Sequence, residues 1–214
     1  MQVLDLERSL HLDIERSFQQ YILQHLPGLV PIFSSIYHAH ICVGIGFIVY
    51  MYTYVSASSF QRVRRTIAMD NALAFLILSL WRCMPPRFIE GYDDVLHRRP
   101  QSIWANNKYR LTLAAMPSLH FGTSSFLAWC IWNFSPRSHR LLRLLGLLYP
   151  ISMLVTILAT ANHWVLDAVI GVLVPLVGWK IQWILLYLLP LENAFFRILR
   201  IDKPAHTDPA GLHR

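Results

Sequence analysis

Apolar residues in this chain come in long runs that are separated by short polar or basic loops. Five of these runs are of the length and composition expected for helices that cross a membrane. They lie at about residues 36–55, 67–84, 117–134, 144–160 and 164–179. The last run extends to 189 if the Lys180 side chain snorkels toward the membrane surface. The pattern predicts an all-α fold, a polytopic membrane helical bundle with about five spanning helices.

The first 25 residues follow a different pattern. Apolar side chains recur there at steps of three and four, with charged residues between them. This spacing predicts one amphipathic helix over residues 3–25, ending at Pro27-Gly28. We expect that helix to lie on the membrane surface, in preference to binding a partner protein.

Composition supports an integral membrane protein. Of 214 residues, 55% are hydrophobic and only 14% are charged, whereas about a quarter are charged in a soluble domain. We expect a single domain over 1–200 and a polar tail over 201–214. The net charge of +7 comes largely from basic loops and is not interleaved with aromatic residues. The expected partner is therefore the lipid bilayer and not nucleic acid, and no obligate protein partner is predicted.

Basic residues also predict the orientation in the membrane. Three closely spaced basic residues follow each of the first, third and fifth runs. The positive-inside bias places these loops in the cytosol. The long polar loop 88–115 and the short turn 161–163 then share the lumenal or extracellular face. No targeting motif identifies the organelle.

Two short motifs stand where apolar runs begin, and both are predicted to lie on that same face. His163 and Asp167 are four residues apart, so they share one side of a helix. Asp167 can accept one imidazole N–H and leave the other ring nitrogen of His163 as a nucleophile. His120, at the start of the third run, can protonate a leaving oxygen and then activate an acceptor.

The remaining candidate residues are basic or polar groups suited to phosphate oxygens. Ser118 stands at a predicted helix N-terminus, where backbone N–H groups attract anions. Three further cations near the site could clamp phosphate oxygens; they are Arg87, Lys108 and Arg110. Tyr37 and His40 could support the site from the first run, or could simply be polar residues at the membrane interface. The chain has no dense carboxylate cluster and no Cys/His spacing typical of a metal site, so we expect neither metal nor cofactor.

These motifs resemble a known family. Pro117-Ser118-Leu119-His120, together with His163 and Asp167, is similar to the type-2 phosphatidic acid phosphatase superfamily. Leu119 and the segment Cys83-Met84-Pro85-Pro86-Arg87 resemble its inositol-phosphorylceramide synthase branch. The resemblance implies a metal-independent lipid phosphotransferase: His163 would form a phosphohistidine, Asp167 would orient it, and His120 would be the general acid and base.

The resemblance has gaps, and other functions stay open. The arginine that the family carries six residues before the second histidine is Ile157 here, and its Lys-x6-Arg-Pro element is not recognisable. Phosphate binding must therefore be redistributed over other residues. Hydrolysis of a lipid phosphate shares the first half-reaction with transfer and is the alternative activity. A non-catalytic lipid-binding membrane protein and a transporter are the competing classes, although no inverted repeat favours the transporter.

Overall fold

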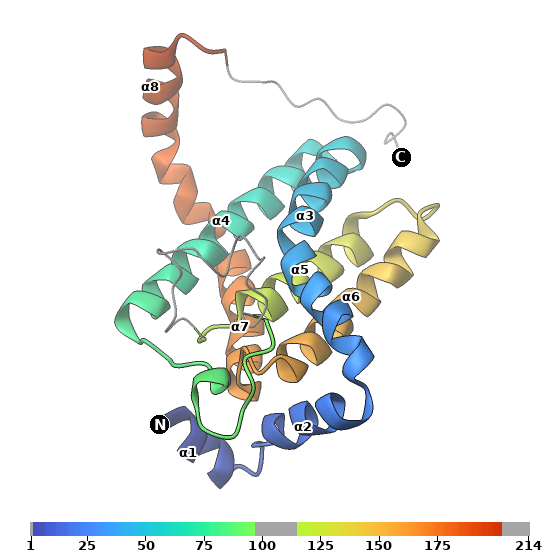
Figure 1. Cartoon of the computed structure of the whole chain (residues 1–214). Coiled ribbons are helices and arrows are strands. Elements are labelled where there is room, and N and C mark those ends of the chain that lie inside the picture. Colours follow the sequence, from blue (N-terminus) through green and yellow to red (C-terminus); the bar gives the residue numbers. More distant parts are fainter. Residues whose placement is uncertain (1, 97–114, 203–214) are drawn as a thin grey trace.

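The computed structural model describes residues 2–96 and 115–202, and every regular helix or strand element in this part of the chain is helical (Figure 1). The all-α prediction is confirmed for it. The elements, in chain order, are α1 (Gln2–Ser9), α2 (Glu15–His25), η1 (Pro27–Leu29), α3 (Val30–Tyr54), α4 (Ala57–Leu80), η2 (Pro86–Phe88), α5 (Leu119–Phe134), α6 (Arg140–Ala159), α7 (Val165–Ile181), η3 (Gln182–Leu188) and α8 (Leu189–Leu199).

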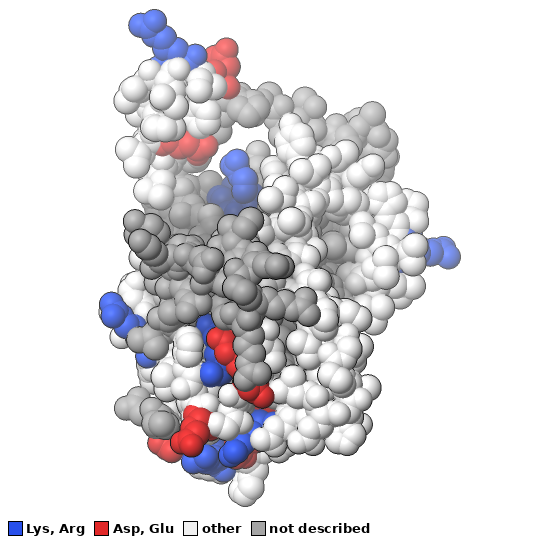
Figure 2. Space-filling view, in the orientation of Figure 1, with Lys and Arg blue, Asp and Glu red and all other residues white. Residues whose placement is uncertain are grey.

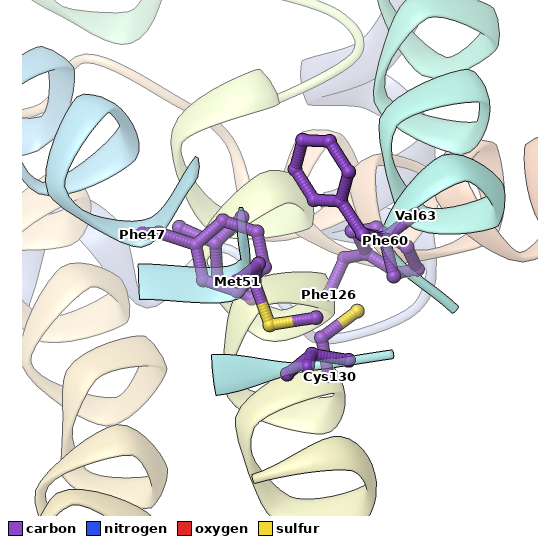
Figure 3. Packing of buried hydrophobic residues seen from close by; sticks show 8 residues of the cluster. Phe47, Met51, Phe60, Val63, Phe126 and Cys130 are labelled. Carbon is purple, nitrogen blue, oxygen red and sulfur yellow. The ribbon is translucent and has the colours of Figure 1, made fainter. Parts of the chain in front are cut away.

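Helix α5 is the centre of the bundle. It packs closely against α6 on one side and α7 on the other, while α7 also packs against α4 and α3 packs against α6 and α5. Figure 3 shows part of the apolar core, in which Phe47 and Met51 of α3 meet side chains of α4 and α5. Met51 and Cys130 are completely buried there. This core fixes α3, α4 and α5 relative to one another.

Three helical stretches are long and apolar enough to cross a membrane: Pro27–Tyr54, Arg140–Ala159 and Val165–Leu199. The expected count of about five spans is not confirmed. Helix α5 has 16 residues, which gives about 24 Å against a hydrocarbon core of about 30 Å. Helix α4 is long enough, but its first half carries Arg62, Arg64 and Arg65, and Asp70 follows near its middle.

The N-terminal segment is two helices, α1 and α2, and not the single amphipathic helix expected over 3–25. The chain turns between them at His11, whose φ is 57°. The buried face is also different from the expected one. Three polar side chains point inward and are at most 1% exposed: Glu7, Glu15 and Gln19. Three apolar side chains of the predicted stripe are about half exposed: Leu6, Leu10 and Ile14.

One end of the bundle gathers the segments that carry the motifs. Helices α1 and α2, the segment 81–96 and the α6–α7 turn lie at the lower end in Figure 1, and the α3–α4 and α5–α6 turns and α8 lie toward the other. On the face drawn in Figure 2, acidic and basic side chains concentrate at that lower end. Which end faces the lumen or the cell exterior stays a prediction.

Candidate active site

The second motif, His163 with Asp167, lies in the turn between α6 and α7 and in the first turn of α7. The backbone reverses at Ala161, whose φ is 49°, and α7 begins two residues after His163. The Asp167 carboxylate folds back to accept the Trp164 backbone N–H at 2.9 Å. Asp167 thereby satisfies one of the N–H groups that a helix N-terminus leaves without a partner, and it is fully buried. The aspartate of the motif is thus a cap of α7 as well as a neighbour of His163.

The ring of His163 is held by a backbone carbonyl. Its Nδ1 lies 2.7 Å from the Ala115 carbonyl oxygen and 3.7 Å from Asp167 Oδ2. A carbonyl oxygen only accepts hydrogen bonds, so Nδ1 carries the proton and Nε2 of the neutral ring has a lone pair. The hydrogen bond that the sequence assigned to Asp167 is therefore made by Ala115. Asp167 stays close enough to stabilise positive charge on the ring.

The first motif, Pro117-Ser118-Leu119-His120, lies at the start of α5. Ser118 caps this helix, because its side-chain oxygen accepts the Phe121 N–H at 3.4 Å. The Ser118 N–H donates to the Asp167 carbonyl oxygen at 3.0 Å and so connects the starts of α5 and α7. His120 follows in the first turn of α5, and its ring centre lies 5.9 Å from that of His163. The two histidines that the sequence predicted to meet are brought together.

Close packing of α5 against α7 holds the N-terminal ends of these two helices together. A Cβ on Gly122 would overlap the carbonyl oxygen of Gly171, and a Cβ on Gly171 would overlap that of Ser118. Helices α5 and α7 approach this closely only because both contact positions lack a side chain. The separation of His120 and His163 therefore depends on two glycines one turn or less from the motifs.

A cavity of about 500 Å³ opens beside the two histidines. His120 and His163 line it together with Tyr37 of α3 and residues of α4. The α4 side of the lining is largely apolar and consists of Ala74, Phe75 and Leu78, next to Asn71. The cavity therefore joins an end lined by two histidines to a wall suited to hydrocarbon.

Tyr37 and a third histidine, His40, lie against His120. Tyr37 stacks on the His120 ring with centroids 4.0 Å apart, and the His40 centroid lies 5.0 Å from it. His40 Nδ1 is also 2.7 Å from the Tyr149 hydroxyl of α6. Tyr37 and His40 therefore contact the site, whereas His38 bonds to its own helix at the Ser34 carbonyl. Tyr149 had no signal in the sequence, because it lies in the middle of an apolar run.

Arg87 lies at the edge of the site. Its backbone N–H donates to the Ala161 carbonyl oxygen at 3.0 Å, and its guanidinium group donates to Asn162 Oδ1 and lies 3.8 Å from the Asp94 carboxylate. The arginine is thus fixed next to the residue that precedes His163. Lys108 and Arg110 lie outside the described residues. Ser118 is fully buried and its hydroxyl oxygen accepts the Phe121 N–H. A role for Ser118 in phosphate binding stays a prediction.

Within residues 2–96 and 115–202, no group of three or more His, Cys, Asp or Glu side chains is arranged to hold a metal ion. What the site offers is an imidazole with an outward lone pair, a second imidazole close by, and a buried carboxylate. These are the parts needed for covalent phosphoryl transfer through nitrogen.

A comparison with protein families agrees with this geometry. The model of the PAP2 superfamily matches residues 1–181, which include both motifs. The chain belongs to the PAP2 superfamily. No curated protein and no solved structure is detectably similar to it. Members of the PAP2 superfamily are generally phosphatases or phosphotransferases, and the apolar helices fit an integral membrane protein that acts on a lipid.

Proposed function

We propose that this PAP2-superfamily protein is an integral membrane lipid phosphotransferase of the inositolphosphotransferase type, which works through a phosphohistidine on His163. The observation that carries the proposal is the state of the His163 ring. Its Nδ1–H is bound by the Ala115 carbonyl oxygen, so Nε2 is an unprotonated nucleophile, and the ring lines the cavity that it shares with His120.

The proposed first half-reaction uses both histidines. Nε2 of His163 attacks the phosphorus atom, and the bond from phosphorus to the glycerol oxygen breaks. His120, entering this step protonated, gives its proton to that oxygen, so diacylglycerol leaves and the headgroup phosphate stays on His163. Asp167, 3.7 Å from Nδ1, stabilises the positive charge that the ring acquires. Arg87, and Lys108 and Arg110 from the loop, are proposed to hold the non-bridging oxygens.

In the second half-reaction, His120 takes the proton of an incoming hydroxyl, whose oxygen attacks phosphorus and releases His163. A lipid hydroxyl gives transfer, and water gives hydrolysis. The apolar wall of Ala74, Phe75 and Leu78 supports a lipid as substrate. Leu119 and the Pro85-Pro86-Arg87 element favour transfer, since they resemble the inositol-phosphorylceramide synthase branch. Hydrolysis of phosphatidate is the second candidate, because the same first half-reaction serves it.

The proposal is tested with purified protein in detergent or lipid. It is offered phosphatidate and, separately, phosphatidylinositol with ceramide, and free phosphate and diacylglycerol are followed. We expect diacylglycerol from the second mixture only when ceramide is present, with no free phosphate, and a loss of about 1,000-fold or more in His163→Ala. His25→Ala is the matched control, because the exposed His25 bonds to a carbonyl oxygen of its own helix, α2.

Free phosphate from phosphatidate, lost in His163→Ala, would replace transfer by hydrolysis. Product formation that His163→Ala leaves unchanged would refute the phosphohistidine. The absence of any product from both mixtures would favour the non-catalytic lipid-binding protein.

A further inference from the structure

Two buried glutamates from the N-terminal helices hold the start of α7. Glu7 Oε1 accepts the Leu166 N–H at 2.8 Å, and Glu15 Oε1 accepts the Val165 N–H at 2.8 Å. These are the first two residues of α7, whose N–H groups have no partner within the helix. Both glutamates are 0% exposed. Two carboxyl groups from distant parts of the chain therefore cap the short segment between His163 and Asp167.

The two glutamates also interact with each other. Their second oxygens, Oε2, are buried, and no other described residue donates a hydrogen bond to them. A hydrogen bond between the two side chains raises the pKa of Glu7 and lowers that of Glu15, as expected when Glu7 carries a proton and donates it to a Glu15 carboxylate. Sharing one proton satisfies both oxygens without burying two adjacent negative charges.

Other titratable groups lie near the pair. Asp167 of α7 adds a third negative charge near Glu7, Asp13 precedes α2, and Arg16 lies within it. The segment 81–96 contributes Cys83 and Tyr92. Burial is the largest cause that raises the pKa of Glu7, from 4.5 to about 8, and it raises that of Glu15 as well. Below a pH of about 8, Glu7 therefore carries a proton that it can donate to Glu15.

We propose that Glu7 and Glu15 are positioning residues: as a carboxylic acid–carboxylate pair, they fasten the N-terminal helices to the first turn of α7 and thereby hold His163 and Asp167 in register with His120. The proposal rests on the proposed function for its effect on catalysis, but the fastening itself is a structural statement. Through this fastening, the N-terminal helices position the site, although neither of them carries a motif residue.

The sign of the pH effect follows from the Glu7 proton. An exposed Glu7 ionises near its ordinary pKa of 4.5, and the docked one near about 8. The docked state thus binds an extra proton between these values, so docking is strongest below 4.5 and is lost progressively as the pH rises through 8. Between pH 6 and pH 9, the ratio of docked to undocked N-terminal helices should fall by roughly 10- to 100-fold.

Glu7→Gln separates the hydrogen bonds of Glu7 from its titration. Its amide oxygen can accept the Leu166 N–H, and its NH₂ can donate to the Glu15 carboxylate, so it imitates protonated Glu7 without titrating. Glu7→Ala removes both contacts. Asp5→Asn is the matched control, because Asp5 is an exposed acidic residue of the same helix.

The first measurement is hydrogen exchange at the Val165 and Leu166 amides at pH 6 and pH 9, expressed relative to the intrinsic exchange rate at each pH. In wild type and Asp5→Asn we expect protection at pH 6 that falls by roughly 10- to 100-fold at pH 9. Glu7→Gln should lose less protection than wild type between pH 6 and pH 9, because only Glu15 of the pair still titrates, and Glu7→Ala should be unprotected at both values. The kcat of each variant should follow its protection.

Protection in Glu7→Ala equal to that in Asp5→Asn would overturn the proposal. So would a Glu7→Gln variant as unprotected as Glu7→Ala at pH 6, or a wild type equally protected at pH 6 and pH 9. Amide exchange requires no substrate. A protein that shows the expected exchange but no phosphotransferase or phosphatase activity would therefore refute the proposed function and leave the fastening intact.

Discussion

At the scale of the residue, the decisive feature is which acceptor holds Nδ1 of His163. The sequence places Asp167 one helical turn from His163, and this spacing favours a direct hydrogen bond between them. The structure instead uses Asp167 Oδ2 to accept the Trp164 N–H and gives Nδ1 to Ala115. The aspartate therefore contributes its charge to the site, while the tautomer is set by a carbonyl oxygen that no side-chain pattern reveals.

Because Asp167 caps α7 and also places a charge near the His163 ring, two substitutions of Asp167 should have different outcomes. Asp167→Asn keeps an oxygen that accepts the Trp164 N–H, so the α7 cap and the folded state should be retained. It removes the charge near the ring, so kcat should fall by about 100-fold or more. Asp167→Ala should lose the cap as well, at about 1 kcal/mol of stability. Thermal unfolding and kcat measured on both variants check this, and an Asp167→Asn variant of wild-type activity would contradict it.

The proton-sharing glutamates show why part of the site was not predictable. Charged residues between apolar ones on an amphipathic helix are expected to face water. Glu7 faces inward only because Leu166, which is 159 positions away, offers an N–H group. Tyr149 contacts His40 across 109 positions. Contacts of this kind depend on tertiary packing and leave no local periodicity in the sequence.

At the scale of the element, the site depends on how closely α5 approaches α7. Gly122 and Gly171 allow backbone contact between the two helices, and the Ser118 N–H then reaches the Asp167 carbonyl oxygen. The two motifs are thus set by a helix contact and not by a shared loop. The sequence correctly placed both motifs at helix starts, but the closeness of the contact needed the structure.

Gly122→Ala should therefore separate the two helix starts. A methyl group there would overlap the Gly171 carbonyl oxygen, and overpacking of this kind costs typically about 1–3 kcal/mol. We expect a lower unfolding temperature in detergent and a kcat reduced by about tenfold or more, since misplacing a reacting group is costly. Gly44→Ala is the matched control, because a Cβ on Gly44 meets nothing within 4 Å. Equal stability and activity of the two variants would show that the close approach is not required.

At the scale of the whole molecule, several polar groups are buried beside the apolar core, and many large apolar side chains face outward. Phe75 is 68% exposed and Leu80 is 80% exposed, whereas Glu7, Glu15 and Asp167 are fully buried. This is the distribution expected of a helical bundle whose solvent is lipid. The apolar runs predicted this architecture. The count of about five spans is not confirmed, because the short helix α5 lies in the centre of the bundle and the charged first half of α4 interrupts its apolar character.

The central claim is that phosphate passes through His163, and trapping the intermediate tests it most directly. His120→Ala is mixed with a lipid-like aryl phosphate, in which the bond from phosphorus to the aryl oxygen is the one that breaks. The phenolate departs without an acid, whereas release of phosphate from the histidine still needs a base. We predict a burst of phenolate about equal to the enzyme present, and phosphate on His163 when the quenched protein is digested and its peptides are sequenced by mass spectrometry. Turnover of the same ester without a phosphorylated His163, or phosphate on another side chain, would contradict the account.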